Sequence, residues 1–578
     1  MNNILQQAIP VANWVENLTN WLTQTFSGLF QVIQNGGSTV MNAMTNLLSL
    51  IHPLVFIGVI TVTAFMISGK KWGLTLFSLI GLLFIYNQNL WTDLMSTVTL
   101  VVISSLVSIV IGVPLGIWMA KNDRVEKFVQ PILDFMQTMP GFVYLIPAVA
   151  FFGIGMVPGV FASVIFALPP TVRFTNLGIR QIPKELVEAS DSFGSTSKQR
   201  LFKLELPLAK STILAGINQT TMLALSMVVI ASMIGAPGLG RGVLSALQHA
   251  QVGNGFVNGL ALVILAIVMD RFTQLINQPN HIKDQQTISK RSKQLVAILA
   301  ILALGGSMAT NFWLNQKNSA TQVTKGTIRL SYVEWDTEVA STNVMAQVLR
   351  DMGYKVELTP LDNAIMWESV AKGQSDAMLS AWLPNTHQAQ YAQYQDKVVD
   401  LGVNLKRAKL GLVVPSYMNV QSIADLTNQA NQTIVGIEPG AGVVSAAEKT
   451  QQTYENLANW HVSTSSSGAM LVALDQAMKK KEPIVITGWA PHWMFAKYDL
   501  KFLADPKETM GGQEAIHTLT RKDFATDFPE ANQALKNFQW STKDIESVML
   551  AINEGKKPEK AAQDWIKANQ SKVATWKK

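Results

Sequence analysis

The N-terminal half of the chain alternates long apolar runs with short polar connections. Eight of these runs predict membrane-spanning helices, although two are shorter than the about 20 residues that a span usually needs. Backbone polar groups in a bilayer must be paired within their own segment, so the runs predict an all-α polytopic membrane domain. The predicted spans are residues 50–69, 72–87, 95–120, 137–155, 157–173, 211–235, 256–276 and 295–314.

The segment before the first span has a weaker, amphipathic pattern. Apolar residues recur at helical spacing from residue 11 to residue 33, with polar residues on the opposite face. A second such stretch follows at 38–51. We expect residues 1–50 to form helices on the extracellular side. They either lie in the membrane interface or pack on neighbouring spans, and the lack of lysine leaves both readings open.

From residue 328 to the C-terminus, apolar strands alternate with amphipathic helices, which is typical of an α/β domain. A weak internal repeat runs through this part. Residues 328–341 parallel residues 433–446, and each copy reads as a strand, a turn and a helix start. Farther along, each copy reaches a Trp-x-Pro turn, at 382–384 and 489–491. The repeat predicts two α/β lobes that face a shared cleft.

Two connections complete this picture of the C-terminal part. We expect the chain to cross between the lobes within residues 415–432, and the charged, helical residues 526–578 to pack back on one lobe. Changes in composition then divide the whole chain into four parts. These are helices at 1–50, a transmembrane domain at 51–292 with a loop at 174–210, a last anchor and linker at 293–327, and a two-lobed domain at 328–578.

The distribution of lysine and arginine indicates which loops face the cytoplasm. Basic residues fill alternate loops, above all 174–210, whereas the intervening loops before the last span carry only Arg241. Basic loops stay inside, so the loop at 174–210 is predicted to be cytoplasmic and the N-terminus extracellular. An even number of spans then places the domain at 328–578 outside the cell. The chain is therefore expected to be a multi-pass protein of the cell membrane.

Composition excludes several kinds of chemistry. The chain has no cysteine, so it has no disulfide, thiolate nucleophile or zinc–thiolate site. It also lacks a nucleotide-binding P-loop, a His-Glu-x-x-His motif and a nucleophile elbow. We expect no catalytic residue, no metal site and no cofactor in this chain. The net charge of +7 lies largely in loops between spans, so it does not indicate a nucleic-acid partner.

Residues 188–207 of the basic loop predict two short helices joined at Phe193-Gly194. They resemble the coupling loop of ABC importer permeases, whose pattern is Glu-Ala-Ala, a spacer, Gly, a longer spacer and Ile-x-Leu-Pro. The small Ser190 and the aliphatic Leu204 are departures from that pattern. The matching residues are Glu188, Ala189, Gly194, Leu206 and Pro207.

The resemblance implies a MetI-like permease core in the bilayer. It implies a homodimer of this chain bound to two copies of a separate ABC ATPase, which carries ATP and magnesium. The coupling loop is then the part of the permease that the ATPase grips.

Three tryptophans of the C-terminal part stand at the ends of predicted strands: Trp335, Trp382 and Trp489. Ligands bind at strand ends that face a cleft. Three indole faces around one point form a cage of negative quadrupole, which suits a quaternary ammonium because such a cation donates no hydrogen bond. A single tryptophan would more often be part of the core, but three at repeat-related positions predict a cation site.

The other end of the ligand needs a different partner. Gly442 and Val443 lie between a predicted strand and a helix, where free backbone N–H groups suit a carboxylate. His492 follows the third tryptophan and is a further candidate donor. These motifs resemble the betaine-binding proteins of ABC importers, in particular the lactic-acid-bacterial osmoprotectant importers that fuse permease and binding protein. The resemblance implies a two-lobed, periplasmic-binding-protein-type domain for glycine betaine and proline betaine.

Three alternatives stay open at this point. In the first alternative, the transported substrate is choline, carnitine or another quaternary amine. A substrate without a carboxylate would leave the backbone N–H donors without an acceptor. In the second alternative, the chain is a membrane-anchored osmolyte sensor, which would have no use for a coupling loop. The third alternative is an extracellular enzyme that uses Glu334 and Asp336 as cleft carboxylates, and a glycosidase pair of this kind must flank one bond.

Overall fold

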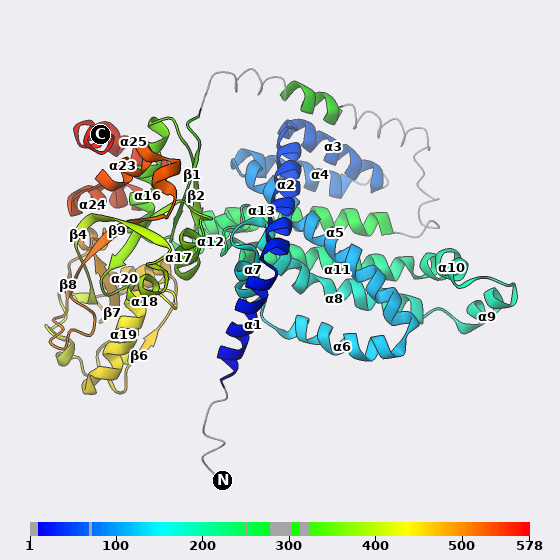
Figure 1. The fold of residues 1–578 in the computed structure, drawn as a ribbon, viewed down its shortest axis with the longest axis horizontal. Coiled ribbons are helices and arrows are strands. Elements are labelled where there is room, and N and C mark those ends of the chain that lie inside the picture. Colours follow the sequence, from blue (N-terminus) through cyan, green and yellow to red (C-terminus); the bar gives the residue numbers. More distant parts are fainter. Residues whose placement is uncertain (1–9, 69–71, 250, 278–302, 312–323) are drawn as a thin grey trace, which may run out of the picture. The chain divides into compact units, whose positions relative to one another are not determined.

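The computed structural model describes residues 10–68, 72–249, 251–277, 303–311 and 324–578. The chain separates into two compact units, residues 1–243 with 256–321 and residues 244–255 with 322–578. In its described part the first unit is helical, whereas the second combines helices with a β-sheet (Figure 1). The predicted anchor and linker at 293–327 lie mainly outside the described residues, apart from a helix at 303–311.

Helices occupy almost all of the described chain before residue 278. They are α1 (Val11–Thr25), α2 (Ser27–Ser49), α3 (Pro53–Ile67), α4 (Trp72–Asn87), α5 (Trp91–Lys121), α6 (Asp123–Thr138), η1 (Gly141–Tyr144), α7 (Leu145–Phe152), α8 (Met156–Arg180), α9 (Lys184–Ser192), α10 (Ser197–Arg200), η2 (Leu201–Glu205), α11 (Leu206–Ser232), α12 (Leu239–Gln248) and α13 (Val252–Asn277). The two predicted amphipathic helices of residues 1–50 correspond to α1 and α2.

The long apolar helices account for only part of the predicted spans. Four helices are long and apolar enough to cross a membrane, and each matches a predicted span: 91–121, 156–180, 197–232 and 252–274. Among the described residues the number rises to six if each of two bent helix pairs is one span. One pair is α2 with α3, bent by 88°. Helix α4 is apolar but shorter.

A single straight span at 137–155 is a wrong prediction. Helix α6 ends at Thr138, and the chain turns by 106° before it continues into η1 and α7. The cause is local: Met139 precedes a proline, whose ring disfavours helical backbone, and Met139 is extended with ψ 134°. This segment is a broken span or a re-entrant loop rather than a through-going helix.

Helix α8 extends well beyond the predicted end of its span at residue 173. It continues to Arg180, where the apolar run has ended. Ion pairs to α6 hold this polar extension: Arg173 lies 2.5 Å from Asp134, and Arg180 lies 2.7 Å from Asp123. Hydropathy alone does not register such pairs, so the predicted span at 157–173 ends before the helix does.

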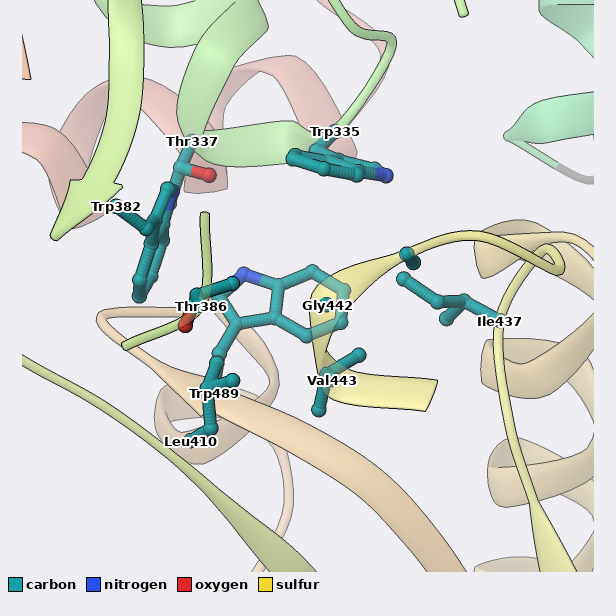
Figure 2. A pocket seen from close by; sticks show the side chains of 10 residues that line it. Trp335, Thr337, Trp382, Thr386, Leu410, Ile437, Gly442, Val443 and Trp489 are labelled. Atoms are coloured by element: carbon teal, nitrogen blue, oxygen red, sulfur yellow. The ribbon is translucent and has the colours of Figure 1, made fainter. Parts of the chain in front are cut away.

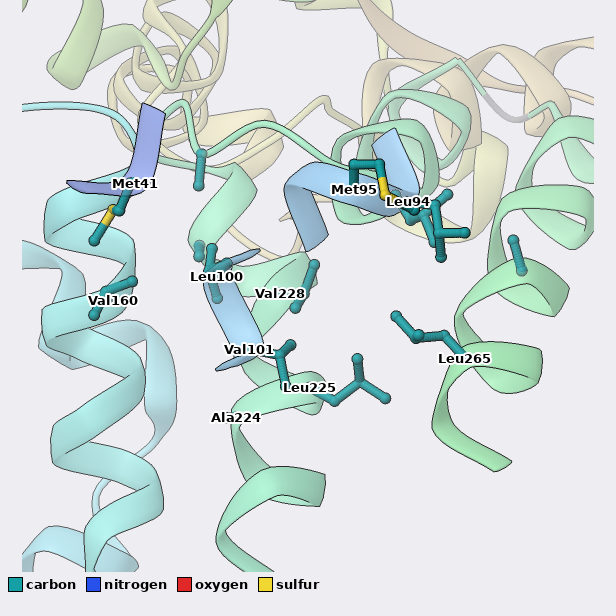
Figure 3. Close-up of a cluster of buried hydrophobic side chains, with 14 of the residues drawn as sticks. Met41, Leu94, Met95, Leu100, Val101, Val160, Ala224, Leu225, Val228 and Leu265 are labelled. Atoms are coloured by element: carbon teal, nitrogen blue, oxygen red, sulfur yellow. The ribbon is translucent and has the colours of Figure 1, made fainter. Parts of the chain in front are cut away.

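The core of the first unit lies between α5, α8, α11 and α13 (Figure 3). Leu100 of α5 and Val228 of α11 are almost fully buried there. Small residues let α5 and α8 approach closely, as in many membrane helix pairs. A Cβ atom on Gly116 of α5 would lie 2.6 Å from the carbonyl oxygen of Val172 in α8. Between α8 and α11, the hydroxyls of Thr171 and Thr220 form a buried hydrogen bond of 2.7 Å.

Strands and helices alternate in the second unit. The strands are β1 (Thr327–Tyr332), β2 (Lys355–Pro360), β3 (Ala377–Leu383), β4 (Val398–Pro415), β5 (Thr433–Val435), β6 (His461–Ser463), β7 (Val485–Ala490), β8 (Leu500–Phe502) and β9 (Gln513–Arg521). The main helices are α16 (Asp336–Asp351), α17 (Asn363–Ala371), α18 (Gln388–Tyr394), α19 (Gly442–Thr453), α20 (Ser467–Lys480), α21 (Met494–Lys497), α22 (Phe524–Asp527), α23 (Pro529–Asn537), α24 (Thr542–Asn553), α25 (Pro558–Ala568) and α26 (Gln570–Trp576).

The strand order confirms the internal repeat and the α/β prediction. The sheet runs β2-β1-β3-β9-β4-β7-β5-β6, with β8 beside β4. In the first half, β1 is parallel to β2 and β3; in the second, β5 is parallel to β6 and β7. In each half, therefore, a central strand lies between two parallel neighbours, and these neighbours come next along the chain or soon after it: β2 and β3 beside β1, and β6 and β7 beside β5. These halves are called the first lobe and the second lobe below.

The crossing between the lobes differs from the prediction. We expected it within residues 415–432, but β4 (398–415) already pairs with β9 on one side and with β7 on the other. One long strand thus belongs to both lobes, and its continuous pairing makes the connection part of the sheet. The C-terminal helices do pack back on one lobe, as predicted: α24 and α25 contact α16 of the first lobe.

Candidate functional site

The three tryptophans singled out in the sequence line one pocket between the two lobes. Trp335 follows β1 and is the N-cap residue of α16, Trp382 lies in β3, and Trp489 lies in β7. All three are more than nine-tenths buried. Figure 2 shows their indole rings on three sides of the pocket. The repeat therefore brings the predicted cage residues together, because equivalent strands end at the same edge of the sheet.

The remaining lining is apolar or uncharged. Besides the tryptophans, the described lining residues are Thr337, Thr386, Leu410, Ile437, Ala441, Gly442 and Val443. Of these, the sequence had singled out Gly442 and Val443 as binding residues, and Thr337 follows directly on the Trp335-Asp336 pair.

The N-terminus of α19 opens onto this pocket, as predicted from the glycine-rich turn. Gly442 and Val443 are the first two residues of the helix and both line the pocket. The first N–H groups of a helix have no acceptor within it. In α19, the backbone N–H groups of Val444 and Ser445 both donate to the carbonyl oxygen of Ala441, the residue before the helix. The geometry suits an anionic group, because both the free donors and the helix dipole favour negative charge.

The two lobes touch at Gly442. A Cβ atom there would lie 2.3 Å from Cγ2 of Thr386 and 2.8 Å from the Thr386 carbonyl oxygen. Thr386 belongs to the first lobe, and Glu514 holds it by accepting hydrogen bonds from its N–H at 2.8 Å and its hydroxyl at 2.5 Å. Only glycine fits at position 442 while the cleft has this closed form.

His492 lies beside the cage but is not among the lining residues. Its Nδ1 accepts the N–H of Met494 at 3.1 Å, so the ring proton is on Nε2, which lies 3.2 Å from Oδ2 of Asp336. The ring also meets Trp489 edge to face at 4.8 Å. A hydrogen bond from His492 to a ligand carboxylate therefore stays a prediction, and it requires Nε2 to be shared with or released from Asp336.

Asp336 joins the two lobes through hydrogen bonds. Its other oxygen accepts the Nε1–H of Trp493 at 3.0 Å. Burial would raise the pKa of Asp336, but the hydrogen bond and the electrostatic attraction of His492, the attraction of His249 and the hydrogen bond from Trp493 together outweigh it and lower that pKa. Asp336 is therefore an ionised acceptor for two aromatic side chains of the second lobe.

Two more carboxylates hold the indole N–H groups of the cage. Trp382 donates to Oε1 of Glu338 at 3.0 Å, and Trp335 donates to Oε1 of Glu438. Burial raises the pKa of Glu338 to about 7, against the opposing effect of its hydrogen bonds. Burial also raises the pKa of Glu438, and the hydrogen bond from Trp335 opposes that change. The sequence offered no signal for either contact.

The predicted coupling loop forms the two short helices expected. Glu188 and Ala189 lie on an exposed face of α9, and the helix stops at Phe193. Gly194 has φ +75°, a left-handed conformation that side chains disfavour. The chain then re-enters helical structure through a capping box at Thr196, and Leu206 and Pro207 begin α11.

Charged side chains brace this loop. Arg200 lies 2.7 Å from Asp191, which ties α10 to α9 across the glycine turn. Glu205, at the end of the π-helical turn before α11, is almost fully buried and lies 2.5 Å from Lys121 at the end of α5. The loop is therefore fastened to two long helices of the same unit, α5 and α11.

Two family models match the chain, one in each part. "Binding-protein-dependent transport system inner membrane component" matches residues 112–279. "Substrate binding domain of ABC-type glycine betaine transport system" matches residues 326–568.

Curated relatives agree with these matches. The glycine betaine/carnitine transport permease protein GbuB of Listeria monocytogenes is 59% identical over 272 residues, 47% of this chain and 96% of that protein. The glycine betaine transport system permease protein OpuAB of Bacillus subtilis is 52% identical over 268 residues, 46% of this chain and 94% of that protein. The structure of lactococcal OpuAC in its closed-liganded conformation complexed with glycine betaine has 58% identity, covers 44% of this chain and all of that chain, and gives a TM-score of 0.43.

The chain thus joins in one polypeptide two components that the relatives carry separately. It belongs to the family of ABC importer permeases of the glycine betaine type, fused to the substrate-binding domain of the same transport system.

Proposed function

We propose that the chain is the membrane-spanning and substrate-binding subunit of an ATP-driven importer that takes up glycine betaine, and also proline betaine, as osmoprotectants. The observation that carries this proposal is the pocket between the lobes. It combines three indole rings with the N-terminus of a helix, and its described lining has no charged residue. A zwitterion with a permanent cation at one end and a carboxylate at the other matches both features.

The cage accounts for the choice of a quaternary amine over an ordinary one. A primary ammonium would leave its N–H groups without acceptors against the indole faces, and an unpaired buried donor is costly. Trimethylammonium has no N–H and gains both cation–π attraction and apolar contact. The relatives GbuB and OpuAB, which are named for glycine betaine, favour the same cargo.

Other quaternary amines are the main alternative, and titration calorimetry of the full chain in detergent separates them. We expect glycine betaine to bind in the micromolar range or tighter. Choline should bind at least about tenfold more weakly, because it lacks the carboxylate that α19 would hold. Carnitine, named for GbuB, keeps a carboxylate but is larger. Absence of glycine betaine binding at millimolar concentration would exclude the proposed cargo.

Replacing Gly442 with alanine tests the geometry of closure. The added Cβ would meet the backbone carbonyl of Thr386, so the cleft cannot close as it does here. We expect glycine betaine affinity to fall by a factor of about ten or more, since even 1.4 kcal/mol of strain is tenfold. Gly440 has room for a Cβ, so the Gly440→Ala variant is a matched control, apart from the strain at its φ of +89°. Equal, unchanged affinities in both variants would contradict closure at residue 442.

ATP hydrolysis is assigned to a separate ATPase, since the sequence carries no P-loop. The loop from Glu188 to Pro207 is the proposed docking element, and exposed apolar side chains support this: Phe193 is 91% exposed and Phe202 is 66% exposed. By analogy with the family, two copies of this chain assemble with two ATPases. The loop then lies in the cytoplasm, and the N-terminus and the binding domain lie outside the cell.

Two other functions are less well supported. A membrane-anchored osmolyte sensor would not need the braced loop between α8 and α11, with its exposed Phe193 and Phe202. An extracellular glycosidase would need two carboxylates beside the aromatic rings that hold its substrate, but Glu334 and Asp336 line a different pocket from the one that holds the three tryptophans. Copurification of an ATPase with the chain would decide between the importer and the sensor.

A further inference from the structure

The two carboxylates behind the cage face the edges of the indole rings rather than the pocket. Glu338 accepts the Nε1–H of Trp382, and Glu438 accepts the Nε1–H of Trp335. Neither carboxylate is among the residues that line the pocket in the described part of the chain. The ligand is therefore separated from both charges by an aromatic ring.

Glu338 is an unusual residue for a protein core. It is 1% exposed, and its second oxygen, Oε2, has no hydrogen-bond partner among the described residues. A buried carboxylate with an unpaired oxygen costs stability, and such groups call for a functional explanation. A glutamine would satisfy the indole N–H equally well without the charge. Above its pKa of about 7, Glu338 adds a negative charge that a glutamine would not supply.

A negative charge at this place strengthens a cation site without weakening its selectivity. In a buried site, opposite charges attract over several ångströms, because the effective dielectric constant is low. Hydrogen bonding to a carboxylate also polarises the indole toward its ring face. Because the carboxylate oxygens are turned to the ring edge, an ordinary amine cannot reach them as hydrogen-bond acceptors. The arrangement favours a permanent cation that has no N–H.

The buried imidazole beside the cage is compatible with this arrangement. His387 stacks at 16° to Trp335 with 6.0 Å between the ring centres, and its Nδ1 accepts the backbone N–H of Trp382. Burial lowers the pKa of His387 to about 3, so the ring is neutral and adds no positive charge next to the cation.

Glu438 has a second effect, because it and Trp335 belong to different lobes. Trp335 opens α16 of the first lobe, and Glu438 precedes α19 of the second lobe. Their hydrogen bond links the two lobes and fixes the plane of one cage ring, and separation of the lobes would break it.

We propose that Glu338 and Glu438 are positioning residues that hold the indole rings of Trp382 and Trp335 and give the cage selectivity for a permanent positive charge. This inference rests on the proposed function, because it takes a betaine as the ligand. It assigns the discrimination between a cation and a neutral molecule of the same shape to carboxylates that never touch the ligand.

The test compares two ligands that differ only in charge. In 3,3-dimethylbutanoate a carbon replaces the quaternary nitrogen of glycine betaine, so shape and carboxylate are kept while the cation is lost. Both ligands are titrated calorimetrically into the full chain at pH 8, where Glu338 is mainly ionised, since its pKa is about 7. The variants are Glu338→Gln, Glu438→Gln and, as a surface control in the same domain, Glu357→Gln.

We expect each cage variant to reduce the preference for glycine betaine over 3,3-dimethylbutanoate, whose tert-butyl head is uncharged, by about tenfold. Most of this change should come from weaker binding of glycine betaine. Glu357→Gln should keep the preference of the wild type. The ratio is measured on one preparation, so a partly folded sample does not distort it. Rescue is checked with Glu338→Asp, which restores the charge.

Two results would overturn the inference. One is an unchanged preference in both glutamine variants; the other is an equal loss of affinity for the two ligands, which is what a purely structural role predicts. A wild type that binds neither ligand would instead refute the proposed function, and the inference with it. The two failures are therefore distinguishable in the same titrations.

Discussion

Alanine at position 489 should weaken glycine betaine binding by at least 1–2 kcal/mol, which is roughly five- to thirtyfold. Trp489 is 4% exposed and contributes one of the three ring faces of the pocket. Its removal takes away a desolvated cation–π contact and opens the pocket to water. The Trp382→Ala variant should lose a similar amount, and the double variant should bind too weakly to titrate. Calorimetry on the full chain measures each loss.

Two controls separate the cage from a general effect of losing tryptophan. Trp489→Phe keeps a smaller aromatic face, so it should lose less affinity than Trp489→Ala. Trp72, in the first unit, is 71% exposed, and Trp72→Ala should bind as the wild type does. If Trp382→Ala and Trp489→Ala both keep wild-type affinity while folded, the pocket is not the binding site.

Valine at position 194 should abolish transport and leave glycine betaine binding intact. Gly194 has φ +75°, and a β-branched residue there is strained by about 1–2 kcal/mol. No atom lies within 4 Å of an added Cβ, so the strain is in the backbone and the new side chain points into open space. In the proposed importer that space belongs to the ATPase. We therefore expect uptake and ATPase copurification to fall together.

Asparagine is the matched replacement, because it tolerates the left-handed conformation better than other side chains. Gly194→Asn should retain much more transport than Gly194→Val. Gly402 of the second unit has φ +106° and equally open surroundings, so Gly402→Val controls for strain at an exposed glycine. Full uptake by Gly194→Val, with its ATPase still bound, would refute the assigned role of the loop.

The cage could be predicted because the same Trp-x-Pro turn recurs at the ends of two predicted strands. Trp382 and Trp489 precede equivalent prolines, and the observed sheet has equivalent strands β3 and β7 at these places. The start of α19 at Gly442 was predictable for the same reason, since a glycine-rich turn between a strand and a helix has few alternatives. Local signals thus placed both ends of the pocket.

Features that depend on distant contacts could not be predicted. Glu338 lies 44 residues from Trp382, and Glu438 lies 103 residues from Trp335, so no spacing pattern links them. The hydrogen bond between His492 and Asp336 spans 156 residues. In the first unit, hydropathy gave apolar runs but not the bend after Met139, where a single proline changes the path of the chain.

Uptake by reconstituted vesicles tests the central claim most directly. The full chain and its ATPase are placed in proteoliposomes with ATP on the side of the ATPase, and labelled glycine betaine is supplied on the side of the binding domain. The account predicts accumulation inside the compartment that holds the ATP, and no accumulation with Trp489→Ala at the same ligand concentration. Accumulation that is equal with and without ATP, or equal for the wild type and Trp489→Ala, would contradict it.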